Sequence, residues 1–292
     1  MIRIPRGSLY ALTTRLQATN SARLAAAEER AATGRRINRP SDAPEDLHEV
    51  HQMDSAVADQ AVWKENAEST TSLLDGMDNA LGRASDIIIR ARELAVAMAS
   101  ETASQDGRTI TAIEVRGLKA TMVDAANTSF NGRYLFAGEA WSTIPFDALG
   151  AYSGSTNEPD ARIGDTRWVR SGMDGSAVFN GTADIFGTLE ALALALEAND
   201  PVAVGVTLTA LDDSTVALSN ARGEVGTDTV SAEDAVVNSE GLSVLFSKRL
   251  SDLVTADPIE AYSTLTALRN TYEATMQVAG SASTRTLLDY LS

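Results

Sequence analysis

The sequence predicts a mainly α-helical protein, in which both chain ends form a long antiparallel helical rod or coiled-coil bundle. A small β-rich outer domain is inserted between the two halves of the rod. Apolar residues recur every three or four positions over long stretches, as in helices that pack along a partner. Aromatic residues make up only 5% of the chain while alanine is abundant, which favours slim, closely packed helices. Residues 130–184 differ, because they are rich in Gly, Ser, Asn and Asp.

These differences predict three parts. Terminal helices would form an inner assembly domain, the rod would be built from two further segments, and the insertion would lie outside. The predicted ranges are 1–40 with 255–292, 41–129 with 185–254, and 130–184.

The N-terminal segment is basic and weakly amphipathic. Leu9, Leu12 and Leu16 form an apolar stripe that fades into a run of alanines. Residues 1–36 hold seven Arg and two Glu, a local charge of +5. Because the net charge of the whole chain is −16, the remaining residues carry −21. Such a segment could dock on an acidic surface of a neighbouring copy, or it could be an ordinary solvated helix face.

A connector follows this first helix. Pro40 and Pro44 are incompatible with a continuous helix, so we expect a rigid, extended link. Ser41 and Asp42 are good N-cap residues and are predicted to start the next helix. An ordinary interdomain loop is the alternative.

The rod helices have the clearest periodicity. From Leu74 to Met98 the apolar spacing alternates between three and four, and it resumes from Thr111 to Ala125 after a polar break around Gly107. A helix from Pro44 to about Ser100 would be roughly 80 Å long. In the C-terminal half, valines repeat every seven residues and predict a matching apolar stripe: Val230, Val237 and Val244.

Short runs and turn signals mark the insertion. Asn131-Gly132, followed by Arg133, is a strong signal for a tight turn at its entrance. The runs RYLFAG, RWV and SAVF predict short strands, and Arg222 to Gly226 is interpreted as a turn between helices because it contains two glycines.

The C-terminal segment predicts a helix that begins at Asp257-Pro258, where Asp caps and Pro is tolerated. Its apolar stripe includes Leu265, Leu268 and Tyr272, and the tail crowds further apolar residues at the chain end: Leu287, Leu288, Tyr290 and Leu291. Exposed apolar termini invite association. We therefore expect this helix to pair with the N-terminal one.

Composition excludes several classes of function. The acidic charge argues against partners such as nucleic acid or an anionic membrane surface. The chain has no cysteine, so disulfides and thiol chemistry are unavailable. We find no run of the ~18 apolar residues of a membrane span and no cleavable signal peptide, and we expect no cofactor.

One residue pair invites a metal hypothesis. His48 and His51 lie three apart, whereas the zinc peptidase pattern requires a spacing of four. A metal-dependent hydrolase therefore remains only a distant alternative, and the chain is not expected to be an enzyme.

Four stretches carry a resemblance to a known family. The stretch TGRRINRPSDAPEDL (33–47) resembles the connector of the flagellin family, with Asn38 in its Ile-Asn element and Ala43 where a second Asp is usual. FNGRYLFAG (130–138) is similar to the family's segment leading into the outer domain, Arg222 to Gly226 is similar to its turn between C-terminal helices, and the tail is similar to its C-terminal end.

The resemblance implies a structural protein of the bacterial flagellum that self-assembles through its terminal helices into a helical array. Residues 132–146 are similar to a member that joins the hook to the filament. Implied partners are further copies, the hook-side junction protein, flagellin and an export chaperone. The implied location is extracellular, on the flagellum, after export without a cleaved signal peptide. A filament-forming flagellin and a solitary coiled-coil scaffold are the alternatives.

Assembly would be coupled to folding. An isolated pair of slim helices is marginally stable in water. We expect residues 1–33 and 257–292 to be largely disordered in the free monomer and to order among neighbours, which circular dichroism and limited proteolysis of the monomer would test.

Overall fold

The computed structural model describes the backbone of residues 6–291 and the side chains of residues 11–280. The chain divides into two compact units, residues 1–58 with 243–292 and residues 59–242. Both are built mainly from helices, which confirms the predicted fold class.

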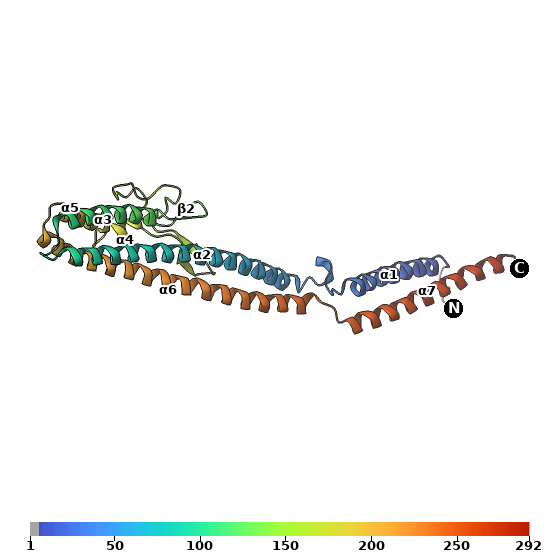
Figure 1. Cartoon of the computed structure of the whole chain (residues 1–292). Coiled ribbons are helices and arrows are strands. Elements are labelled where there is room, and N and C mark those ends of the chain that lie inside the picture. The colour runs from blue at the N-terminus through green and yellow to red at the C-terminus, as the bar shows by residue number, and fades with distance from the viewer. Residues whose placement is uncertain (1–5, 292) are drawn as a thin grey trace. The chain divides into compact units, whose positions relative to one another are not determined.

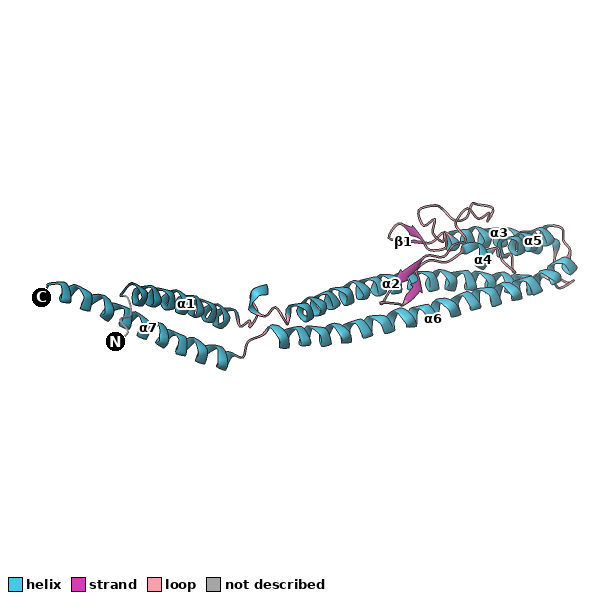
Figure 2. Ribbon diagram, turned by 180° about the vertical axis from the view of Figure 1, so that it is seen from behind, coloured by secondary structure: helices cyan, strands magenta, loops and turns pink. Residues whose placement is uncertain are grey.

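The first unit pairs the two ends of the chain. Helix α1 lies beside helix α7 in both views, which confirms the predicted pairing of the terminal helices (Figures 1 and 2). A short 3₁₀ turn in the connector completes the unit, together with the start of α2 and the end of α6. The bounds are α1 Arg6–Thr33, the 3₁₀ turn Pro40–Asp42, α2 Leu47–Met98, α6 Pro201–Val254 and α7 Pro258–Leu291.

The second unit is a helical bundle with a shared core. Helices α2 and α6 run along each other, and α3 (Gln105–Ala126) packs against α5 (Ile185–Glu197) (Figure 1). The predicted apolar residues of α2 are buried in this core, including Leu74, Leu81 and Ile88. The periodicity that predicted these helices is therefore the periodicity of the core contacts.

Buried Arg108 joins the two turns at one end of the bundle. Its guanidinium donates to the carbonyl oxygens of Met98 (3.0 Å) and Ser100 (2.7 Å) and to Asn199 Oδ1. Because these bonds satisfy a buried cation, the turn between α2 and α3 is tied to the turn between α5 and α6.

The insertion contains two small hairpins. Strand β1 (Ser129–Phe130) pairs with β2 (Arg133–Tyr134), and β3 (Asp160–Arg162) pairs with β4 (Trp168–Arg170), both antiparallel. The predicted turn between β1 and β2 is confirmed: Asn131 and Gly132 have φ of 49° and 77°, as a two-residue hairpin turn requires.

The run SAVF is not a strand, contrary to its prediction. It lies in the short helix α4 (Gly175–Phe179), whose N-cap Asp174 accepts a hydrogen bond from the Ser176 backbone N–H. The capping bond decides the local conformation, because a short apolar run alone does not distinguish a strand from a helical turn.

The glycine-rich segment Arg222 to Gly226 is not a turn, so that prediction was also wrong. Helix α6 continues through it without interruption. Two glycines cost helix stability, but Ala221 and Val225 are buried in the core and keep the helix in place. Arg222 adds an ion pair to Asp78 at 2.8 Å.

Replacing Gly223 and Gly226 by alanine should therefore stabilise the protein. A Cβ at either position meets no atom within 4 Å. Each substitution should raise the free energy of unfolding by about 0.8–1 kcal/mol, the difference between alanine and glycine inside a helix. Urea denaturation followed by circular dichroism measures this.

A matched Gly138→Ala variant should do the opposite. Gly138 has a φ of +57°, and its Cβ would lie 2.2 Å from the carbonyl oxygen of Ser155. If the two helical substitutions instead lower stability, the segment is not a regular helix in solution.

The heptad-spaced valines of α6 do not form a buried stripe. Val230, Val237 and Val244 are 57%, 69% and 70% exposed, and the buried residues of α6, such as Val225 and Ala232, lie on the other side of the helix. A spacing of seven places residues on one face of a helix but does not say which face is buried. The repeat of valines every seven residues therefore marks an exposed face of α6.

Within residues 6–291, α6 is the single helix that could cross a membrane by length and composition alone. Mean hydropathy reaches 1.2 over 18 of its residues, of which 28% are buried. Val204, Leu211 and Leu218 of this helix belong to the core of the bundle, which accounts for much of its apolar character.

Candidate assembly surface of the terminal helices

Helix α7 turns its predicted apolar stripe towards α1. Leu265, Leu268 and Tyr272 are half-buried on this face. Two polar contacts fix the register further along: Asn20 Nδ2 donates to Thr275 Oγ1 at 2.9 Å, and a Gln17 amide N–H donates to the Met276 sulfur. The apolar stripe predicted for α7 therefore lies on the face that meets α1.

Helix α1 uses a face other than the predicted one. Leu12 is 53% exposed, and Leu16 is 47% exposed at the edge of a shallow groove shared with α7. Gln17 and Asn20 make the side-chain hydrogen bonds to α7, and Ala27 is buried. The expectation that Leu12 and Leu16 belong to the pairing stripe of α1 was wrong, because polar residues on the pairing face do not register in a search for apolar periodicity.

Much apolar surface on this pair is left uncovered. Ile259 is 81% exposed, Tyr262 61% and Met276 42%, in addition to Leu12 and Leu16. Together these side chains lie on two helices that, within the described residues, pack mainly against one another. An uncovered apolar surface of this kind marks a site of association.

The remaining predicted assembly residues cannot be placed. Their side chains lie outside the described residues: Leu9, Leu287, Leu288, Tyr290 and Leu291.

The connector is held by Asp42. One of its carboxylate oxygens accepts the backbone N–H groups of Asn38 (3.0 Å) and Arg39 (2.8 Å), and these bonds lower the pKa of Asp42. Pro40 begins the 3₁₀ turn and Ser41 lies within it. Asp42 thus stabilises the connector's own turn. It does not cap α2, which begins five residues later, so that part of the prediction was wrong.

Asn38 and Pro44 flank this turn, two residues before its start and two after its end. The Asn38 amide donates to the Arg35 carbonyl oxygen, and its own oxygen accepts from Thr33 Oγ1 at 3.1 Å, which ties the connector to the end of α1. Pro44 is exposed between the turn and α2, where its ring is compatible with the break in the helix.

Arg36 holds the segment between α1 and α2 against the segment between α6 and α7. Its backbone N–H donates to the Val254 carbonyl oxygen at 2.6 Å, and its guanidinium donates to the Leu253 carbonyl oxygen and to Asp46 at 2.7 Å each. Ala256 N–H donates back to the Gly34 carbonyl oxygen at 2.9 Å. Sequence analysis missed this role, and the pair of arginines after Gly34 was its only signal.

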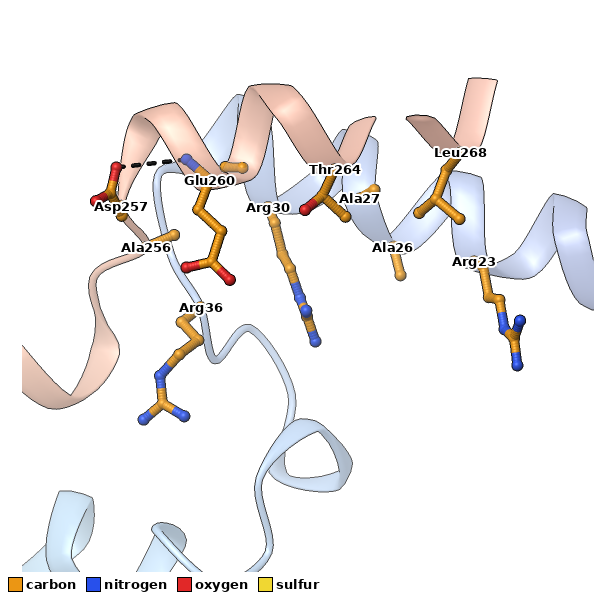
Figure 3. Close-up of a pocket in the computed structure, with 11 residues that line it drawn as sticks. Arg23, Ala26, Ala27, Arg30, Arg36, Ala256, Asp257, Glu260, Thr264 and Leu268 are labelled. Carbon is orange, nitrogen blue, oxygen red and sulfur yellow. Dashed lines mark hydrogen bonds between the residues drawn. The ribbon is translucent and has the colours of Figure 1, made fainter. Parts of the chain in front are cut away.

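A groove of about 350 Å³ lies between α1 and α7 next to this link. Arg23, Arg30 and Arg36 extend from its α1 side, and Asp257 and Glu260 come from the start of α7 (Figure 3). Asp257 is already engaged as the N-cap of α7, since its carboxylate accepts the Ile259 N–H at 2.7 Å.

The other predicted positions lie elsewhere. Asn131 and Gly132 form the β1–β2 turn, and the Arg133 guanidinium lies 5.6 Å from the Trp141 ring centroid, all in the second unit. His48 and His51 are exposed on α2, and the described residues contain no group of three potential metal ligands. The hydrolase hypothesis gains no site from this geometry.

Paired terminal helices, a helical bundle and an inserted hairpin domain are the features that the comparison with known proteins has to account for. Residues 8–140 match the bacterial flagellin N-terminal helical region, which confirms the predicted family resemblance.

Individual relatives are flagellar hook-associated protein 3 of Salmonella typhimurium and of Escherichia coli. The first is 29% identical over 52% of this chain and 49% of its own length. The second is 26% identical over 86% of this chain and 89% of its own. The chain therefore spans about half the length of the Salmonella relative in that comparison.

A solved structure shares the fold. FlgL of Xanthomonas campestris matches with a TM-score of 0.62 at 18% identity, over 68% of this chain and 99% of the other.

Proposed function

We propose that this chain is a structural subunit of the bacterial flagellum that joins hook to filament. It would self-assemble into a helical array through its terminal helices. The observation that supports this most is the uncovered apolar surface of α1 and α7, on which Leu12 and Ile259 are more than half exposed. Relatives named hook-associated protein 3 support the junction role in particular.

The physical mechanism is completion of a partial bundle. Two helices alone bury a narrow stripe, with Leu268 and Tyr272 only half-buried. Neighbouring copies that cover the rest of the surface contribute roughly 25 cal/mol for each Å² of apolar area removed from water. Order among residues 1–33 and 257–292 then depends on assembly, which stays a prediction about the free monomer.

A position between hook and filament determines which partners such a subunit would have. It would contact further copies laterally, the hook-side junction protein at one end and flagellin at the other. We also propose export without a cleaved signal peptide and a cytoplasmic chaperone that covers the α7 stripe before export. The exposed apolar surface supports a chaperone, since it would associate prematurely if left bare.

The position of the protein on the flagellum tests this proposal. A small epitope tag in the exposed loop near Leu149, which is 77% exposed, should label a narrow band at the tip of the hook. Labelling along the whole filament would instead identify a filament-forming flagellin. Absence from isolated flagella would contradict both roles.

A further inference from the structure

We propose that a patch on α6 of one copy seats in the groove between α1 and α7 of a second copy. The patch, here called the α6 patch, consists of Val230, Glu233, Asp234 and Val237. The groove, here called the arginine groove, has Arg23, Arg30 and Arg36 along one side. This inference rests on the proposed self-assembly and names two surfaces that carry it.

The α6 patch lacks a partner within its own unit. Val230 and Val237 are 57% and 69% exposed, on the side of α6 turned away from the core. Spacings of three and four place Glu233 and Asp234 beside them, on the same side of the helix. Among the described residues neither carboxylate forms an ion pair or a hydrogen bond, whereas nearby Glu240 is paired with Lys64 at 2.6 Å. The patch is thus a valine ridge edged by two uncompensated negative charges.

The arginine groove has the opposite character. Its floor is apolar, formed by Ala27, Ala261 and Leu268. Arg23 and Arg30 are exposed, and within the described residues their side chains form no ion pair. Arg36 extends from the same side, as Figure 3 shows, although Asp46 already neutralises it in part.

Acidic groups also line the groove and limit what it accepts. Asp257 is held by the first turn of α7, and the Glu260 side chain extends from α7 towards the space between Arg30 and Arg36 (Figure 3). Arg36 is paired with Asp46, and Asp257 is held by backbone N–H groups, so Arg23 and Arg30 are the cations that no carboxylate of the described residues pairs with. The groove therefore favours an apolar ridge with acidic edges over a basic one.

The spacing of the charges matches as well. Arg23 and Arg30 are seven residues apart, or about 10 Å along α1. Val230 and Val237 have the same separation along α6, with Glu233 and Asp234 between them. A helix laid along the groove could thus place its valines over the alanine floor while its carboxylates reach the two arginines.

A second copy is the occupant that these features favour. Two α6 patches facing each other would bring four carboxylates together, which is repulsive. An α6 patch facing an arginine groove joins two different surfaces, so the contact is heterologous and can repeat from copy to copy. Such a repeat is what a helical array requires.

Disulfide cross-linking in flagella tests the contact. The chain has no cysteine, so introduced thiols are the only ones in it. An Ala26→Cys, Val237→Cys double variant places one thiol at the edge of the groove and one on the patch. Oxidation of isolated flagella should give a ladder of covalent oligomers, because each copy is bonded to the next.

Matched controls separate the contact from random collision. Ala26→Cys paired with Ile113→Cys, which lies on α3 and is 67% exposed, should give at least about tenfold fewer oligomers. A ladder of equal strength from this control would overturn the inference. So would a normal band at the hook tip without any ladder, and in that case the proposed function would still stand.

Charge reversal supplies a second, independent readout. Arg23→Glu with Arg30→Glu, or Glu233→Arg with Asp234→Arg, should each reduce the amount of protein in flagella at least about tenfold. Combining all four substitutions in one chain should restore it, because every contact then has opposite charges again. Failure of the combination to recover would overturn the inference. Absence of the unaltered protein from flagella would refute the proposed function, and the inference with it.

Discussion

Replacing Leu265 and Leu268 by glutamate is expected to remove the protein from flagella while leaving the bundle of the second unit folded. Both side chains are half-buried on the face of α7 that meets α1. The burial of two leucines is lost, at roughly 1.5–3 kcal/mol for each fully buried one, and two charges are placed on the apolar face of α7 that meets α1. A pair of helices with so little stability to begin with would separate.

Two measurements distinguish this outcome from general unfolding. The amount of protein in isolated flagella should fall to background, while protease resistance of residues 59–242 stays unchanged. A control with Thr266→Glu and Asn270→Glu adds the same charge at exposed positions of α7 and should assemble more efficiently. Normal assembly of the leucine variant would contradict a role for the α1–α7 pair.

Phe146→Ala should destabilise the second unit by about 3–5 kcal/mol. Phe146 is 1% exposed, and its ring lies 5.1–5.4 Å from the ring centroids of Tyr152, Phe179 and Phe186. Removing it leaves a cavity among these rings and loses aromatic contacts worth about 0.5–1.5 kcal/mol per pair beyond burial. Phe179, which lies beside Phe136, Phe146 and Phe186, is the other ring with three such neighbours.

Urea denaturation followed by tyrosine and tryptophan fluorescence measures this loss. The backbone of Phe146 is bonded on both sides by the Asn127 side chain at 2.9 Å, and alanine keeps those bonds. Leu149→Ala, at a position that is 77% exposed, should change stability by less than about 0.5 kcal/mol. A loss below about 1 kcal/mol for Phe146→Ala would mean that the cluster relaxes to fill the space.

The long helices could be predicted because one repeating signal determines them. Leu74, Leu81 and Ile88 recur with the period of a helix and are buried together. The Asn131-Gly132 turn was predictable for a related reason, since few dipeptides adopt positive φ at both positions. In these elements local preference and tertiary packing favour the same structure.

Other features needed information that a single sequence lacks. Gly223 and Gly226 predict a break locally, but contacts between α6 and the core keep the helix continuous. Apolar spacing alone assigns Leu12 and Leu16 to the pairing stripe of α1. The structure shows that Gln17 and Asn20 make the hydrogen bonds to α7, and such polar contacts can be recognised only when the partner helix is known. The roles of Arg36 and the arginine groove depend on residues more than 200 positions apart.

The bonds between the two links have a mechanical consequence. Arg36 to Val254 and Ala256 to Gly34 hold two chain segments side by side, as in a short two-stranded ribbon. A single strand rotates freely about its backbone bonds, whereas two strands fastened to each other resist torsion and share any pull. If the chain is part of a rotating filament, as proposed, a torque on α2 and α6 would therefore be transmitted to α1 and α7 through two hydrogen-bonded segments, and rotation about a single flexible segment would not dissipate it.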